Sequence, residues 1–464
     1  MKRLRVWIAL GLLILPIVAR TAWFYRGVYQ RQTPVPTPDY ASLTMPTPPL
    51  ATLQPEKVSV PVTGKAVALD QAHDNLFGVT EIEALAGAVT GLGARLETVT
   101  YESSLTDTLK YASAYMVIAP SLSFTPEEIQ QVRRFVERGG QLLVLVDPTR
   151  MFLGGEVATA NSLLTPYDLS FSDDYLYNLV ENEGNYRNVL FRQFTPVSLT
   201  EGLTTIAFYA ACSVNTTTGT PLIQGDERTF SSRTDTGGNL AAAALSANQQ
   251  VLALGDLTFI TPPYYQVADN ARLIRRVAEF LVSGERTHSL ADAPFLFSRP
   301  VSIVATKSIT LTADVAEPLG KWQTALRPIS VTLNMTALPA PDSDVIVLGS
   351  YTPSDDLMPY VMPFLGVSLT ETAPFTVTAP ITGVKGPIGA SIQVPGLGKV
   401  ARSGTGLMLF SRTEKRSTLI LLADTPEGLS KLVEMLATGD LTACAVQERV
   451  ALCSVGKAKS TSAP

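Results

Sequence analysis

The 464-residue sequence contains only three cysteines and two histidines. So few cysteines exclude a disulfide-dense scaffold, and a Ser-His-Asp or Cys-His catalytic device has only His73 or His288 to use as its base. Dinucleotide-binding, phosphate-loop, zinc-spaced and basic-aromatic patterns are missing as well. We therefore expect no nucleotide cofactor, no metal and no nucleic-acid partner.

Charge is also sparse, because only 17% of the residues are Asp, Glu, Lys or Arg and the formal net charge is -5. A mildly acidic chain has no general attraction for nucleic acid or for anionic lipid. The chain is longer than a domain with a single hydrophobic core usually is, so two globular domains and a tail are expected.

The N-terminus is the longest apolar run in the chain. Residues 1–5 (MKRLR) are basic, residues 6–19 are apolar, and Arg20 and the aromatic residues 23–25 follow. A cleaved signal peptide and an uncleaved signal anchor both fit, and the poor small-residue motif around Ala19 favours an anchor over residues 1–25. The expected location is the cell membrane, with one span, a cytoplasmic N-terminus and an extracytoplasmic bulk.

A Pro/Thr-rich linker over residues 26–61 separates this anchor from the first domain. We expect an α/β domain over residues 62–284, with an insertion at about residues 151–250. A second, smaller domain of α/β or α+β type is expected over residues 300–464, where residues 391–412 favour antiparallel hairpins.

The clearest element is a strand-helix-strand unit over residues 115–150. Thr125 is a helix N-cap, Glu128 completes a capping box, and Gly139-Gly140 ends the helix. A second capping box is expected at Thr80 and Glu83. Such right-handed crossovers join parallel strands, so the fold class is α/β, and we predict a doubly wound parallel sheet of amidotransferase-like or flavodoxin-like type.

Two cysteines stand near the C-terminus. If residues 442–446 and 450–455 form a hairpin, Cys444 and Cys453 face each other closely enough for a disulfide. Glu448-Arg449 is not a favoured turn pair, and the alternative is a helical segment without a bridge.

Four segments together carry a resemblance: residues 68–75 (ALDQAHDN), 125–148 (TPEEIQQVRRFVERGGQLLVLVDP), 161–164 (NSLL) and 251–260 (VLALGDLTFI). In this order they resemble a prokaryotic family defined by a domain of unknown function, number 4350, in the class I glutamine amidotransferase-like superfamily. The resemblance covers about residues 62–284. It implies similarity to extracytoplasmic accessory subunits of gliding-type ABC export systems, and hence protein partners such as ABC transporter subunits.

Active members of that superfamily place a cysteine on a Gly-flanked elbow after a central strand. Here the strand runs into Asp147-Pro148-Thr149 without a cysteine, so we expect no catalytic residue of that kind.

Acidic side chains and one histidine follow the ends of predicted parallel strands, where open sheets bind ligands. The candidate rim consists of Asp70, His73, Asp74, Asn75, Asp147 and Asp256. The alternative is that these side chains cap loops and helices through local hydrogen bonds.

Two functions follow. The favoured one is a non-enzymatic, membrane-anchored, extracytoplasmic binding or scaffold protein, such as an accessory subunit of a transport system. The alternative is an extracytoplasmic hydrolase or metal-dependent enzyme that uses His73 and nearby carboxylates. An enzyme requires a deep pocket with His73 and two carboxylates at one point, whereas a scaffold requires a shallow rim and an exposed aromatic patch.

Overall fold

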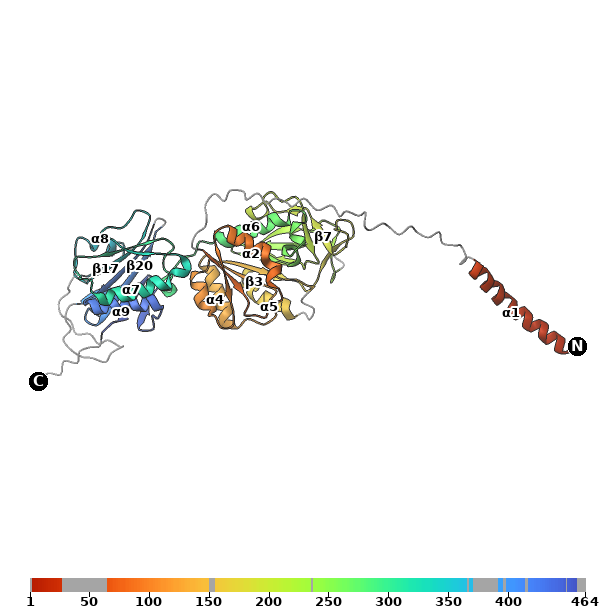
Figure 1. The fold of residues 1–464 in the computed structure, drawn as a ribbon, viewed down its shortest axis with the longest axis horizontal. Coiled ribbons are helices and arrows are strands. Elements are labelled where there is room, and N and C mark those ends of the chain that lie inside the picture. The colour runs from red at the N-terminus through yellow and green to blue at the C-terminus, as the bar shows by residue number, and fades with distance from the viewer. Residues whose placement is uncertain are drawn as a thin grey trace, which may run out of the picture. The chain divides into compact units, whose positions relative to one another are not determined.

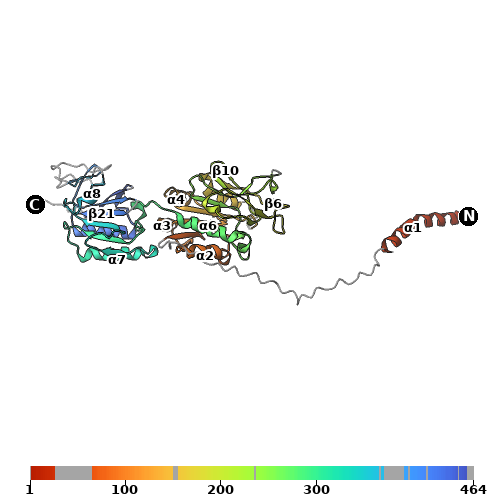
Figure 2. The same cartoon turned by 90° about the horizontal axis from the view of Figure 1, so that it is seen from above.

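The computed structural model describes residues 2–26, 65–149, 155–234, 237–364, 367–369, 391–394, 398–413, 416–447 and 449–456. The chain divides into two units, residues 1–58 and residues 59–464, and each is described by itself. Figures 1 and 2 show the elements of both units. From residue 27 on, the expected linker lies outside the described residues.

Helix α1 (Lys2–Arg26) is the described element of the first unit. Residues Arg3–Arg26 are long and apolar enough to cross a membrane, and an 18-residue window within them has a mean hydropathy of 1.9. A helix rises about 1.5 Å per residue, so this length covers a hydrocarbon core of about 30 Å. The N-terminal apolar helix is thus confirmed, and it fits either a single-pass anchor or a signal peptide.

The unit of residues 59–464 contains two large mixed sheets, and we call the part built on each of them a domain. An eight-stranded mixed sheet forms the centre of the first domain, in the order β2-β1-β3-β4-β14-β13-β11-β8. The first five of these strands are parallel, and β13, β11 and β8 are antiparallel. The strands are β1 (Ala66–Asp70), β2 (Arg95–Val99), β3 (Ala114–Ile118), β4 (Gln141–Leu145), β8 (Gln193–Phe194), β11 (Thr220–Gln224), β13 (Ala241–Leu245) and β14 (Val251–Leu254).

Helices pack against both faces of this sheet. Helices α2 (Glu83–Gly91) and α6 (Asn270–Ser283) share a core with Leu69 and Met116. On the opposite face, α3 (Leu105–Tyr111), α4 (Pro126–Glu137) and α5 (Gly155–Leu164) share a core with Ala68 and Tyr115. Neighbouring residues of one strand point to opposite faces of the sheet. Because helices cover both faces, the central strands of this sheet are apolar at nearly every position.

Helix α4 begins and ends as its sequence predicts. Thr125 Oγ accepts the Glu128 N–H at 3.2 Å, and the Glu128 carboxylate accepts the Thr125 N–H at 2.8 Å. Gly139 has a φ of +93°, and a Cβ there would meet the Glu285 carbonyl oxygen at 2.3 Å. Val132 and Val136 are buried and Ile129 packs partly exposed against the same core, so these three residues form the apolar face of the helix.

The capping box predicted at Thr80 and Glu83 is wrong. A 3-10 turn, η1 (Val79–Ile82), precedes α2, and the Glu81 carboxylate accepts the Gly78 N–H at 2.6 Å. The chain starts to turn at Gly78, two residues before Thr80, because Gly78 is the extended residue that precedes the turn. Glu81 therefore stands three residues after the start of the turn and takes the role expected of Glu83.

The region expected to be an insertion contributes β8, β11 and β13 to the main sheet, which is therefore not purely parallel. Its other strands form three ribbons, β10-β5, β12-β6 and β7-β9. These strands are β5 (Leu169–Phe171), β6 (Leu176–Asn178), β7 (Asn188–Phe191), β9 (Ile206–Tyr209), β10 (Val214–Thr216) and β12 (Thr229–Ser231). They contain three or four residues each, too few to show a clear alternating pattern in sequence.

Six further 3-10 turns connect the elements of this unit. They are η2 (Thr165–Tyr167), η3 (Ser198–Thr200), η4 (Thr258–Ile260), η5 (Tyr264–Gln266), η6 (Leu290–Asp292) and η7 (Arg327–Ile329).

A seven-stranded mixed sheet forms the second domain, in the order β16-β15-β17-β21-β20-β23-β22. The first four of these strands are parallel and the last three are antiparallel. The strands are β15 (Val301–Ala305), β16 (Leu333–Met335), β17 (Asp344–Gly349), β20 (Thr405–Arg412), β21 (Ser417–Ala423), β22 (Cys444–Val446) and β23 (Val450–Ser454).

Helices α7 (Ala313–Ala325) and α9 (Pro426–Thr438) pack together on one face of this second sheet. The other face is covered by α8 (Met358–Val361) and the hairpin of β18 (Ser391–Val394) and β19 (Gly398–Ala401). Both domains are thus mixed α/β, which confirms the α/β class in this coarse form.

The β22-β23 hairpin places Cys444 opposite Cys453, with their Cα atoms 4.0 Å apart, and a disulfide joins them. Cys212 is a free, buried thiol.

Candidate functional site

The end of β1 places Asp70 and His73 against each other. Asp70 is the last residue of the strand and is fully buried, and His73 is 4% exposed. His73 Nδ1 lies 2.9 Å from Asp70 Oδ1 and 3.0 Å from Asp70 Oδ2. Tyr115, on the neighbouring strand β3, donates its hydroxyl to Asp70 Oδ1 at 2.9 Å. Asp70 therefore holds the imidazole in one orientation, with Nδ1 as the donor.

A second carboxylate stands on the other side of the ring. His73 Nε2 is 3.6 Å from Glu128 Oε2, and the ring stacks on Phe124 with centroids 3.7 Å apart. The same Glu128 carboxylate accepts the N–H and the hydroxyl of Thr125, each at 2.8 Å. Each nitrogen of His73 thus faces a carboxylate that has other donors already.

The protonation of this group follows from its contacts. Burial by itself lowers the pKa of His73, but the hydrogen bond and charge of Asp70, together with Glu128, outweigh it and raise the pKa above its ordinary 6.5. Burial raises the pKa of Glu128, and the stronger combined effect of Thr125 and His73 lowers it. Burial and Asp70 hold the pKa of Tyr115 well above its usual range. The arrangement therefore favours an imidazolium between two carboxylates.

A small pocket opens beside His73. It has a volume of about 240 Å³, and Tyr101, Leu105, Ser123 and Glu128 also line it. Pockets that hold small-molecule ligands usually measure about 300–1,000 Å³. This one is below that range.

Asp74 and Asn75 form hydrogen bonds that hold the loop around His73. Asp74 is exposed and accepts the Tyr101 hydroxyl at 3.2 Å. Asn75 donates to the Ile118 carbonyl at 2.8 Å and accepts the His73 N–H at 3.3 Å. The bond between Asn75 and His73 is local in sequence, and the other two join the loop to β3 and to the segment after β2.

Asp147 and Asp256 form a second group. Both are fully buried, and Thr258 links them, because its hydroxyl donates to Asp147 at 3.1 Å and its N–H donates to Asp256 at 2.8 Å. Burial and the charge of Asp147 raise the pKa of Asp256 well above its usual value. Burial likewise raises the pKa of the Cys212 thiol.

The predicted rim therefore consists of two hydrogen-bonded groups, one at His73 and one at Thr258. Among the described residues, no set of three or more His, Cys, Asp or Glu side chains is placed to hold a metal ion.

Three residues of the His73 group were not in the predicted rim: Tyr115, Phe124 and Glu128. Glu128 was recognised only as a helix cap, and Tyr115 only as part of a buried strand. One signal was present in the sequence, since Tyr115 is the single polar aromatic residue within the otherwise apolar run 115–120. The stacking of Phe124 on His73 depends on the loop between β3 and α4 and has no signal in the sequence.

An aromatic patch lies on the β6-β12 ribbon, and we define it as Tyr175, Tyr177, Tyr186, Arg187 and Phe230. The Tyr177 ring lies 5.7 Å from Phe230 and 6.1 Å from Tyr186, and the Arg187 guanidinium lies 4.4 Å above Tyr175. Next to this patch, Leu179 is 73% exposed.

The fold and these groups define a chain with an apolar N-terminal helix and two mixed α/β domains, the first of which carries a buried Asp-His-Glu group. Residues 82–278 match the model of a family described as a domain of unknown function (DUF4350). No curated protein matches the chain.

Two solved structures are similar to parts of the chain. One is the mmIFT52 N-terminal domain, with 15% identity and a TM-score of 0.40, covering 48% of this chain and all of that domain. The other is a putative ThuA-like protein from Bacteroides uniformis, with 13% identity and a TM-score of 0.31, covering 48% of this chain and 93% of that one. At these TM-scores neither similarity carries an argument about function.

Proposed function

We propose that the chain is a non-enzymatic, membrane-anchored, extracytoplasmic binding or scaffold protein that acts as an accessory subunit of a transport system. The observation that carries the proposal is the position of His73 between two carboxylates. A general base needs a nitrogen with a free lone pair within reach of the substrate. The charged imidazolium favoured by Asp70 and Glu128 has no free lone pair, so it supports the loop rather than a reaction.

The amidotransferase-like relationship remains part of this proposal. The strand β4 ends before Asp147-Pro148-Thr149, where the elbow cysteine of active members would stand. Pro148 lacks the N–H that an oxyanion hole uses. In this proposal, the domain lacks the nucleophile for catalysis and binds a partner through its surface.

The location is supported by two features far apart in sequence. Helix α1 suits an anchor, and the Cys444–Cys453 disulfide suits an oxidising compartment outside the cytoplasm. The cytoplasmic N-terminus rests on the basic residues 1–5.

The aromatic patch supports a protein partner. Tyr and Arg are enriched where protein interfaces concentrate their binding energy. The partner we propose is another subunit in the same membrane, in keeping with the anchor.

The alternative enzyme draws on one observation, the Asp70–His73 pair, because a carboxylate on Nδ1 is also the way in which catalytic histidines are oriented. Ser103 and Ser123 line the adjoining pocket, and a serine hydroxyl is a nucleophile that such a histidine can activate. In that case Glu128 must leave Nε2 when substrate binds.

One experiment separates the two functions. A photo-crosslinking residue is placed at position 186 of the full chain in its native membrane, with and without His73→Gln. We expect a crosslink to a transport-system subunit, identified by mass spectrometry and unaffected by His73→Gln. The same residue at position 101, beside the small pocket, is the matched control and is expected to give no such adduct.

Two results contradict the proposal. One is the absence of any transport subunit among the adducts at position 186. The other is a hydrolytic or metal-dependent activity of the purified full chain that His73→Gln abolishes while circular dichroism shows an unchanged fold.

A further inference from the structure

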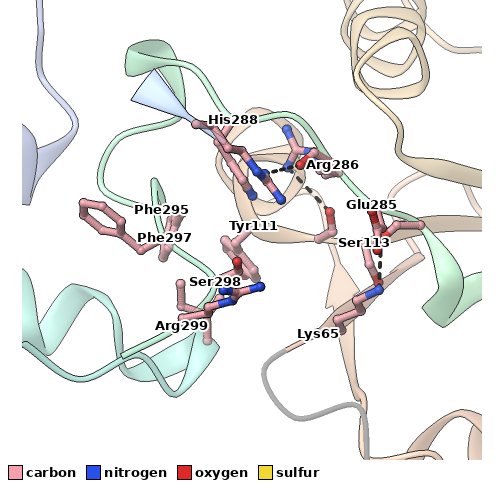
Figure 3. A pocket seen from close by; sticks show the side chains of 14 residues that line it. Lys65, Tyr111, Ser113, Glu285, Arg286, His288, Phe295, Phe297, Ser298 and Arg299 are labelled. Carbon is pink, nitrogen blue, oxygen red and sulfur yellow. Dashed lines mark hydrogen bonds between the residues drawn. The ribbon is translucent and has the colours of Figure 1, made fainter. Parts of the chain in front are cut away.

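A second pocket in the unit of residues 59–464 has a volume of about 260 Å³. It lies where the first domain, the connecting segment 284–299 and the second domain meet, and we call it the junction pocket. Lys65 and Tyr111 line it from the first domain, Arg286 and Arg299 from the connecting segment, and Arg412 from the second domain. Figure 3 shows Lys65, Arg286 and Arg299 around it from three sides.

Positive charge predominates around this pocket. Among the residues that the structure describes, five cationic side chains in or beside it face three carboxylates, which leaves an excess of two positive charges. The cations are Lys65, Arg138, Arg286, Arg299 and Arg412, and the carboxylates are Glu285, Asp292 and Asp344. Uncompensated charge at a partly enclosed site is costly unless an anion binds there.

The carboxylates pair with only some of these cationic side chains. Asp292 pairs with Arg138 at 3.0 Å and with Arg286 at 3.4 Å. Within the described part of the chain, no carboxylate lies within 4.0 Å of the Lys65 ammonium or of the Arg412 guanidinium. Lys65 donates instead to the carbonyls of Val282 and Gly284, and Arg412 donates to the carbonyl of Arg286 at 2.5 Å.

Two buried nitrogens in the pocket lack a partner among the described residues. They are Nε of Arg286, a residue only 7% exposed, and Nδ1 of His288. Burial and the charge of Arg286 lower the pKa of His288 to about 3, so its imidazole is neutral at pH 7. Buried polar groups nearly always have a hydrogen-bond partner, and both residues line the same pocket.

We propose that the junction pocket binds a phosphate group. A phosphate has close to two negative charges at neutral pH and oxygens that match the fork of a guanidinium. Its charge equals the excess around the pocket, and its oxygens accept from Arg286 Nε, from Arg412 and, in the Nδ1–H tautomer, from His288. The volume admits a phosphate with a small organic body, so both inorganic phosphate and a phosphate monoester fit. This site is distinct from the His73 group and does not depend on the proposed function.

Titration calorimetry of the full chain in detergent tests this proposal, at pH 7 and constant ionic strength set with sodium chloride. We expect saturable binding of inorganic phosphate that Arg412→Gln weakens by about tenfold. Glutamine retains an N–H for the Arg286 carbonyl, so the variant removes charge with little loss of structure. Arg133→Gln is the matched control, because Arg133 is exposed on α4 and pairs with Glu137. It is expected to leave the affinity unchanged.

Glycerol 3-phosphate distinguishes the source of the group. Tighter binding than that of inorganic phosphate indicates a phosphate monoester, and weaker binding indicates free phosphate. The absence of saturable binding by either probe, or equal affinities in the wild type and Arg412→Gln, overturns the proposal. Hydrogen exchange of the wild type is an independent check, because phosphate should slow exchange of the amides in residues 284–299, and no slowing contradicts the site.

Discussion

Among the described residues, the two α/β domains share the same order of strands, except that the second has one helix-strand unit fewer. In the first domain the strand order β2-β1-β3-β4-β14-β13 runs through the sheet, and in the second the order is β16-β15-β17-β21-β20. Each order begins with parallel strands and ends with the antiparallel partner of the last one. The helix pair α2 and α6 corresponds to α7 and α9, each on one face of its sheet. Among its described residues, the second domain has no counterpart of the α4-β4 unit.

The ends of the strands differ much more than their order. Strand β1 ends in Asp70, whereas its counterpart β15 ends in Ala305. Strand β14 continues into Gly255-Asp256, whereas β21 ends at Ala423 before Asp424. The shared topology therefore does not require the Asp-His-Glu group, which is found in the first domain.

The largest effect on stability is expected at the residue that precedes the aspartate at the end of β14 and of β21. This residue is Gly255 in the first domain and Ala423 in the second, so Gly255→Ala gives the first domain the residue of the second. In the first domain this Cβ would lie 2.3 Å from the Cys212 carbonyl oxygen, so the backbone must move, and we expect a loss of about 3 kcal/mol in the free energy of unfolding. Hydrogen exchange of β14 measures the loss.

The reverse replacement, Ala423→Gly, is the control and is expected to cost about 1 kcal/mol, seen in β21. Equal effects of the two replacements contradict the difference between the strand ends.

The disulfide belongs to the second domain alone. Replacing Cys444 and Cys453 together by serine is expected to lower the stability of that domain by about 2.5 kcal/mol, because the bridge closes a short loop of the unfolded chain. Thermal unfolding with domain-resolved hydrogen exchange gives the measurement. A reductant should reproduce the effect in the wild type, and an equal loss in β1 or β3 is not expected.

A buried tyrosine occurs in each domain and allows a matched comparison. Tyr115 donates to the Asp70 carboxylate at 2.9 Å, and Tyr351 donates to the Thr405 carbonyl at 3.1 Å. Tyr115→Phe leaves a charged acceptor without one donor, and we expect a loss of about 2 kcal/mol, against about 1 kcal/mol for Tyr351→Phe. Urea unfolding measures both, and a larger loss for Tyr351→Phe counts against a charged Asp70.

The smallest effect is the part of the pH dependence of stability that His73 contributes. The folded state raises the pKa of His73, so its ion pairs contribute fully below the unfolded pKa of about 6.5, and the contribution is lost as the pH rises through the raised value. We expect a small decline in stability over that interval, which His73→Gln removes.

Residues 301–464 contain no histidine and serve as an internal control. A wild-type stability that rises with pH relative to that of His73→Gln over this interval would contradict the imidazolium.

Local signals in the sequence determined several elements correctly. Thr125, Pro126 and Glu128 define the start of α4, Gly139 its end, and the apolar runs around them the buried strands β3 and β4. These features depend on residues three to five positions apart, whose hydrogen bonds and packing are set by the helix and strand periods. The apolar helix at the N-terminus is likewise readable from composition and length.

Contacts between distant residues were decided only by the tertiary structure. The approach of Glu128 to His73 and the Thr258–Asp147 bond that divides the predicted rim join residues about 50 to 110 positions apart. The antiparallel half of the first sheet joins strands closer in sequence, but its pairing also follows from the tertiary structure. The sequence determined which side chains were charged, apolar or able to turn the chain. Which charges face each other depends on the order and register of the strands, because a carboxylate acts on a histidine through a distance of a few ångströms that no local pattern encodes.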